Sequence, residues 1–122
     1  MYDIIIPRSP GVAEGRSSGS AFGEYAWAVA SSDDKTVDVT GQTRRCFAKI
    51  DRVLGEFGSR KSLILSATVY LANMPDKGRF DALWREWVGP NPTDWPQRAC
   101  IGVELSPGTL VEIAVIAARE IQ

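Results

Sequence analysis

The feature that most constrains the fold of this chain is a pair of apolar, strand-like segments in its second half. The first alternates, with one face formed by Leu63, Leu65, Ala67, Val69 and Leu71 and the other by Ile64, Ser66, Thr68 and Tyr70. That pattern predicts a strand with two partly buried faces. The second, Leu110 to Ala118, is almost wholly apolar and is interrupted only by Glu112. Its longest apolar run is far short of a membrane span.

Two helices are predicted around the first of these strands. One starts near residues 38–40 and ends at Gly58, where a left-handed C-terminal residue belongs. Its apolar face has helical spacing and consists of Cys46, Phe47, Ile50, Val53, Leu54 and Phe57. The other opens at Asn73 to Asp76 and ends at the Gly89–Pro92 segment. Its apolar stripe is Phe80, Leu83, Trp84, Trp87 and Val88.

The remaining segments predict further strands. Residues 2–6 fit a short strand, residues 7–20 a loop with an edge strand near its end, and residues 21–30 a strand with a turn or bulge at Gly23-Glu24. Ala99 to Leu105 alternates, and Ser106-Pro107-Gly108 suggests a turn that returns it as a hairpin into the last segment. The order predicts an α+β fold, with a mixed β-sheet and two helices on one face, in a single domain spanning residues 1–122.

Composition excludes several functions. The net charge is −1 and the pI about 5.4, so no basic field attracts nucleic acid or a membrane surface. Two cysteines are too few for a disulfide framework, and no metal-ligand spacing occurs, so no metal site is expected. With no secretory leader, a cytoplasmic protein is expected. The absence of histidine rules out histidine-activated nucleophiles.

Three residues near the end of the chain are the main chemical candidates. Glu112 interrupts an apolar strand, although an edge position or a plain ion pair would also explain it. Arg98 has a fixed charge and a planar donor fork suited to a carboxylate, but most arginines are simply exposed. Cys100 points to the same face as Arg98 and either reacts or fills space. The register of the hairpin decides whether Arg98 and Glu112 share a face, and the sequence leaves that open.

From about Thr40 to Ala118 the chain resembles the RidA (reactive intermediate deaminase, YjgF-like) family. The resemblance rests on Gln42-Thr43, the helix end Ile50 to Leu54 with Gly58-Ser59, the segments Ala67 to Met74 and Pro96 to Cys100, and the final strand from Leu110. It implies a fold like that of trimeric chorismate mutase and a homotrimer with clefts between subunits. It also implies hydrolysis of 2-imino or enamino acids to 2-oxo acids and ammonia without a cofactor.

The resemblance also assigns roles to residues. Arg98 matches the arginine that holds the substrate carboxylate, Glu112 the glutamate that positions the attacking water, and Cys100 a residue that lines the cleft. Ser31 and Asp81 stand where the chain departs from the family pattern, in the expected wall of the cleft, and complete the predicted substrate-binding set with Trp84. For Trp84, packing in the core or an interface is the alternative.

These observations leave three functions open. The first is a cofactor-independent deaminase of small imines or enamines that carry a carboxylate. The second is a non-catalytic trimeric module that binds small carboxylate metabolites in its clefts. The third is a ribonuclease, an activity attributed to some relatives, against which the acidic pI and the absence of histidine argue.

Overall fold

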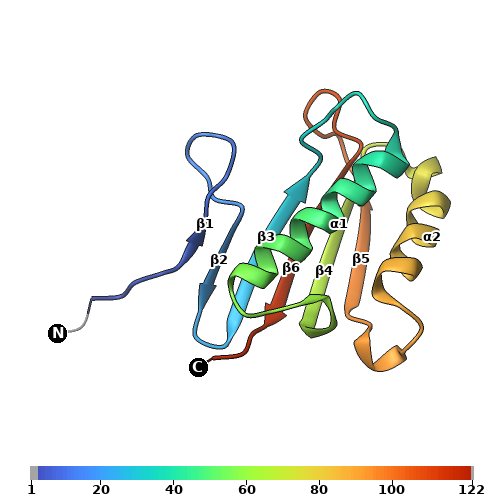
Figure 1. Ribbon diagram of the computed structural model, residues 1–122. Helices are drawn as coiled ribbons and strands as arrows, with labels where there is room; N and C mark the ends of the chain where they lie inside the picture. The colour runs from blue at the N-terminus through green and yellow to red at the C-terminus, as the bar shows by residue number, and fades with distance from the viewer. Residues whose placement is uncertain (1–2, 122) are drawn as a thin grey trace.

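Two helices, α1 (Val39–Glu56) and α2 (Lys77–Val88), lie on one face of a six-stranded sheet in the computed structural model of the chain, which describes residues 3–121 (Figure 1). The sheet order is β1-β2-β3-β6-β4-β5. Its strands are β1 (Arg8–Ser9), β2 (Gly19–Phe22), β3 (Tyr25–Ser31), β4 (Ile64–Leu71), β5 (Gln97–Gly102) and β6 (Val111–Ala118). β4 and β5 are parallel and the other pairs antiparallel, so the predicted α+β class with a mixed sheet is confirmed.

The first strands differ from the expectation. Residues 3–6 of the proposed segment 2–6 form no strand, and residues 1 and 2 lie outside the described part. The sheet instead begins at β1. The predicted strand over residues 21–30 is two antiparallel strands, β2 and β3, joined at Gly23-Glu24. Gly23 has a φ of +57°, which glycine adopts without steric cost, so the turn reading of this pair is the correct one.

The predicted hairpin between the last two strands is wrong. β6 lies between β3 and β4, and β5 pairs with the far side of β4 (Figure 1). Ser106 to Gly108 therefore belongs to a connection that carries the chain past β4. Alternating side chains identify a strand and its faces but carry no information about which strand lies beside it. No hairpin register therefore determines whether Arg98 and Glu112 share a face. Their relative positions depend on β4, which lies between their two strands.

The alternation predicted for β4 is interrupted at its first residues. A β-bulge falls between Ile64 and Ser66, where the register with β6 shifts. Ile64 is consequently buried on the helix side, and Leu65 is exposed, the reverse of the expectation. One extra residue in a strand moves the side chains of the residues before it to the opposite face of the sheet. Ala67, Val69 and Leu71 come after the bulge and are buried as predicted.

Helix α1 matches its prediction at both ends. The N-cap residue Asp38 accepts a hydrogen bond from the backbone N–H of Gly41 at 2.9 Å, and Gly58, just after the helix, has a φ of +74°. The buried face includes Cys46, as expected. Phe47 on this face stacks on Trp87 of α2 at 4.3 Å between ring centroids, and the two helices close the core over the sheet.

The other face of the sheet carries no helix. Apolar side chains on it remain well exposed, among them Trp27, Val29, Ile101 and Ile116. These residues alternate with buried ones along β3 and β6 and with half-buried ones along β5. Exposed apolar side chains gathered on one sheet face are typical of surfaces that associate. Within residues 3–121, neither helix has the length and apolar character needed to span a membrane.

Candidate functional site

The guanidinium of Arg98 is fixed by a carboxylate on the neighbouring helix. Arg98 lies on β5, the edge strand beside α2, and its Nη2 donates to Asp81 Oδ1 at 2.7 Å. Asp81 Oδ2 accepts from Lys77 Nζ, one helical turn earlier, also at 2.7 Å. The Arg98 and Asp81 side chains are only 18% and 21% exposed, so this is a partly desolvated pair rather than a surface ion pair.

Aromatic rings form the floor under Arg98. Its guanidinium carbon lies 5.1 Å from the centroid of the Trp84 ring and 5.5 Å from that of Phe80. Both rings belong to the apolar stripe of α2 and are buried. Cation–π attraction and the Asp81 bond thus hold the guanidinium from two sides. Among the described residues its hydrogen bonding uses Nη2 alone, so Nε and Nη1 remain available to a planar ligand such as a carboxylate.

Asp81 stays ionised in this setting. Burial raises the pKa of its carboxyl, but the hydrogen bonds from Lys77 and Arg98 and the charges of both residues outweigh burial. The net result is a pKa below the ordinary value of 3.8. The cluster of two cations and one carboxylate therefore keeps one positive charge near neutral pH, and an anionic ligand can still be attracted to it.

Cys100 lies two residues beyond Arg98 and on the same face. It pairs with Val69 in the parallel ladder, is half-buried and packs against the core cluster. Burial raises the pKa of the other thiol, Cys46, to about 12. Cys46 is thus an inert core residue, whereas Cys100 lies at the edge of the Arg98 site.

Glu112 lies on the opposite face of the sheet. Its partners across the ladders are Ser31 on β3 and Tyr70 on β4, and all three are half-buried. Ala67, the partner of Arg98 on β4, is three residues from Tyr70, and odd spacings along a strand point to opposite faces. Within residues 3–121, Glu112 has no hydrogen-bond or ion-pair partner. It is a half-buried carboxylate free to hold a water or a ligand.

A groove of about 1080 Å³ opens beside Glu112. The connection between β1 and β2 forms one wall, and the exposed side of α1 forms the other. Its polar lining includes Arg16, Ser31, Lys35, Lys49 and Glu112. Arg98 does not line it, since β6 and β4 separate β5 from β3 in the sheet (Figure 1).

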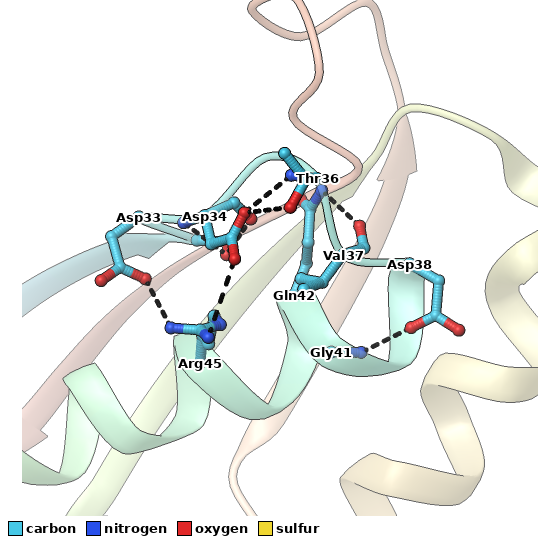
Figure 2. A network of polar contacts seen from close by, with 9 residues as sticks. Asp33, Asp34, Thr36, Val37, Asp38, Gly41, Gln42 and Arg45 are labelled. Atoms are coloured by element: carbon cyan, nitrogen blue, oxygen red, sulfur yellow. Dashed lines mark hydrogen bonds and ion pairs between the residues drawn. The ribbon is translucent and has the colours of Figure 1, made fainter.

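The loop between β3 and α1 is held rigid at the end of this groove. Figure 2 shows Asp34 accepting from the backbone N–H and the hydroxyl of Thr36, at 2.9 and 2.6 Å. Arg45 on α1 reaches back to Asp33 at 3.1 Å and to Asp34 at 3.9 Å. These bonds hold the loop against α1, and the two aspartates neutralise the charge of Arg45.

The buried amide of Gln42 joins the same helix to the entry of β6. Its Nε2 donates to the carbonyls of Val37 and Gly108, at 3.2 and 2.9 Å, and its Oε1 accepts from the backbone N–H of Leu110 at 2.9 Å. The amide is fully buried and uses both its donor and acceptor groups. Gln42 thereby positions the start of the strand that carries Glu112.

The predicted site residues thus fall into two separate groups. Arg98, Cys100, Asp81 and Trp84 lie together at the β5–α2 edge, and Glu112 and Ser31 lie together beside the groove. Sequence reasoning missed Lys77, although its spacing of four residues from Asp81 on a helix is a signal for an ion pair. Over residues 3–121, no cluster of side chains suited to a metal ion occurs.

Comparisons with known proteins agree on one family. Residues 22–119 match the family model described as Endoribonuclease L-PSP. A RutC family protein of Haemophilus ducreyi is 43% identical over 86 residues, which cover 70% of this chain and 72% of the relative. The chain is also similar to the crystal structure of an uncharacterised protein from Pseudomonas aeruginosa. That likeness has a TM-score of 0.84 at 31% identity and covers 95% of this chain and 100% of the other.

A second solved structure carries a family name. It is a member of the YjgF protein family from Neisseria meningitidis, with a TM-score of 0.85 at 27% identity over 97% of this chain and 98% of that one. The extent of these matches covers both helices and the strands that bear Arg98 and Glu112. This chain therefore belongs to the RidA/YjgF family, which includes the RutC proteins and is described by the L-PSP model.

Proposed function

We propose that this protein hydrolyses small 2-imino or enamino carboxylic acids to 2-oxo acids and ammonia, without a cofactor and in the cytoplasm. The observation that carries the proposal is the guanidinium of Arg98, which is held by Asp81 and two aromatic rings with two of its nitrogens available. A pre-positioned donor fork of this kind binds a carboxylate at little cost in conformational entropy.

The chemistry needs little beyond orientation. The oxygen of a water forms a bond to the electrophilic C2 of the imine, and the C–N bond then breaks. The nitrogen leaves as ammonia with the protons of that water, so no oxidant or reductant enters. Glu112 is half-buried and has no other partner in residues 3–121, and its carboxylate is suited to orient the water and accept its proton.

One subunit cannot bring these two residues together, because they lie on opposite faces of the sheet. We propose that a homotrimer does so, with the β5 edge of each subunit against the groove of the next. A head-to-tail contact of this type closes into a ring when the rotation allows it. The uncovered sheet face supports the proposal, since it offers exposed Trp27, Val29 and Ile116 and a hollow of about 800 Å³ for burial.

The test is a coupled assay in which an amino acid oxidase generates imines from alanine or 2-aminobutyrate. We expect the wild-type chain to accelerate release of the 2-oxo acid, and Arg98→Ala to lose that acceleration. The fold should persist in Arg98→Ala, because Asp81 keeps its bond to Lys77. Arg85→Ala is the matched control, since Arg85 is an exposed arginine of α2 outside the cluster. Normal turnover by Arg98→Ala would overturn the assignment.

A specific observation also supports a second candidate, a trimeric module that binds small carboxylates without chemistry. Asp81 already occupies one nitrogen of Arg98 and competes with a ligand for the same charge. Calorimetric binding of 2-oxo acids by a protein that hydrolyses no imine in the panel would select this candidate.

A further inference from the structure

The groove beside Glu112 has a charge opposite to that of the chain. Five basic side chains line it, Arg16, Lys35, Arg45, Lys49 and Arg52, against two acidic ones, Asp33 and Glu112. The whole chain carries a net charge of −1. A cleft whose lining has one sign of charge concentrates ligands of the opposite sign, so the groove favours anions.

Two of the five cations are already neutralised. Arg45 pairs with Asp33 at 3.1 Å (Figure 2), and Arg52 pairs with Glu56, one helical turn later, at 2.9 Å. The other three, Arg16, Lys35 and Lys49, form no salt bridge with any residue from 3 to 121. These three are the cations that a ligand in the groove would meet.

The three cations come from different segments and line the same groove as Glu112. Arg16 belongs to the β1–β2 connection, Lys35 to the loop before α1, and Lys49 to α1 itself. Lys35 Nζ lies 3.5 Å from the hydroxyl of Ser31, which is the ladder partner of Glu112.

The proposed hydrolysis leaves these cations without a role. It uses one cation, Arg98, for the substrate carboxylate and one carboxylate, Glu112, for the water. Three further cations around Glu112 exceed what a monocarboxylate needs. They are suited to a second acidic group on the same substrate.

We propose that the groove selects 2-imino acids whose side chain ends in a second carboxylate. The inference rests on the proposed function and names its substrate class. The C1 carboxylate binds Arg98 of one subunit, and C2 lies beside Glu112 of the next. The side-chain carboxylate then lies among Arg16, Lys35 and Lys49.

The experiment compares imines that differ in one charge. Amino acid oxidases convert glutamate and glutamine to imines of nearly equal size, of which only the first has a second carboxylate. We expect kcat/KM for the glutamate imine to exceed that for the glutamine imine by about tenfold at low salt, and the ratio to fall as salt rises. The double variant Lys35→Met, Lys49→Met should reduce the ratio toward one and leave the glutamine imine rate nearly unchanged.

Arg44→Met is the matched control, because Arg44 is an exposed cation of α1 that does not line the groove. It should keep the full ratio. Equal kcat/KM for the two imines, in a protein that hydrolyses the alanine imine normally, would overturn this inference alone.

If the protein hydrolyses none of the imines, including the alanine imine, the proposed function is overturned instead. Calorimetry then decides the inference, with 2-oxoglutarate and 2-oxobutyrate as probes. Tighter binding of 2-oxoglutarate that is lost in the Lys35, Lys49 double variant supports it, and equal binding overturns it. Displacement of 2-oxoglutarate by a short RNA at equal charge concentration would also overturn it, since the groove would then be a general polyanion surface.

Discussion

Asp81 shares its two carboxylate oxygens between Arg98 and Lys77, each at 2.7 Å. The carboxylate of Asp81 therefore already neutralises part of the guanidinium charge that a ligand of Arg98 would contact. The pair fixes the arginine in place and at the same time weakens its attraction for a second carboxylate. We therefore expect Asp81 to limit the affinity of the site for a carboxylate ligand.

Asp81→Asn should tighten binding of 2-oxobutyrate on the order of tenfold, because it removes a competing negative charge and retains an acceptor for Arg98. The pKa of Asp81 is lowered, so its stabilising effect is complete above the ordinary pKa and is lost only as the pH falls through the lower folded value. The affinity ratio between variant and wild type should thus stay flat between about pH 5 and 8. Calorimetry across that range measures it, and a weaker variant would contradict the competing role.

Glu112→Gln should slow imine hydrolysis about a hundredfold while binding of the 2-oxo acid changes little, since the amide keeps the shape but cannot accept a proton. Steady-state kinetics and calorimetry separate the two effects. Glu104→Gln, an exposed glutamate on the connection to β6, is the control. An unchanged turnover number in Glu112→Gln would remove the carboxylate from the mechanism.

Mixing two inactive variants tests whether the site spans subunits. Arg98→Ala and Glu112→Gln chains, unfolded together in equal amounts and refolded, should regain about a quarter of the wild-type activity, because that share of interfaces pairs an intact Arg98 with an intact Glu112. Each variant refolded alone should stay inactive. No recovery in the mixture would place both residues' functions within one chain, in conflict with their opposite faces.

The two thiols should react at different rates. Burial raises the pKa of Cys46 to about 12, so its thiol remains protonated at pH 8. Cys100 is half-buried at the edge of the sheet and should be alkylated first. Mass spectrometry after brief treatment with iodoacetamide is expected to find one label, absent from Cys100→Ser. A label on Cys46 in the folded protein would contradict its placement in the core.

Gln42→Leu should destabilise the protein by about 3 kcal/mol or more, because it leaves the carbonyls of Val37 and Gly108 and the N–H of Leu110 without partners in a buried place. The change shows as a lower urea midpoint with an unaltered slope. Arg44→Leu, on the exposed side of the same helix, should shift the midpoint little.

Local patterns predicted the helices well. The spacing of Cys46 to Phe57 and the glycine at 58 determined both the buried face and the end of α1, since these depend on neighbours three or four residues away. The same reasoning gave the bounds of β4 and β6 within a residue. It gave the wrong face for Ile64 and Leu65, because a bulge depends on the partner strand.

The pairing of strands and the contacts between distant residues could not be predicted from the sequence. Nothing in the residues from 99 to 118 indicates that β4 separates β5 from β6, so the relation of Arg98 to Glu112 could not be derived. The bond between Arg98 and Asp81 joins residues 17 apart through packing of α2 on the sheet edge. The resemblance to a family named the residues that structure then divided into two groups, and their roles stay predictions.

The place of β6 in the sheet has a consequence for biosynthesis. A nascent chain that has not yet delivered residues 111–118 has β1 to β3 as one ribbon and β4 and β5 as another, with no strand to join them. Until β6 pairs with them, the facing edges of β3 and β4 and the side of α1 that packs on β6 remain uncovered. The sheet is therefore continuous only once residues 111–118 pair with both β3 and β4.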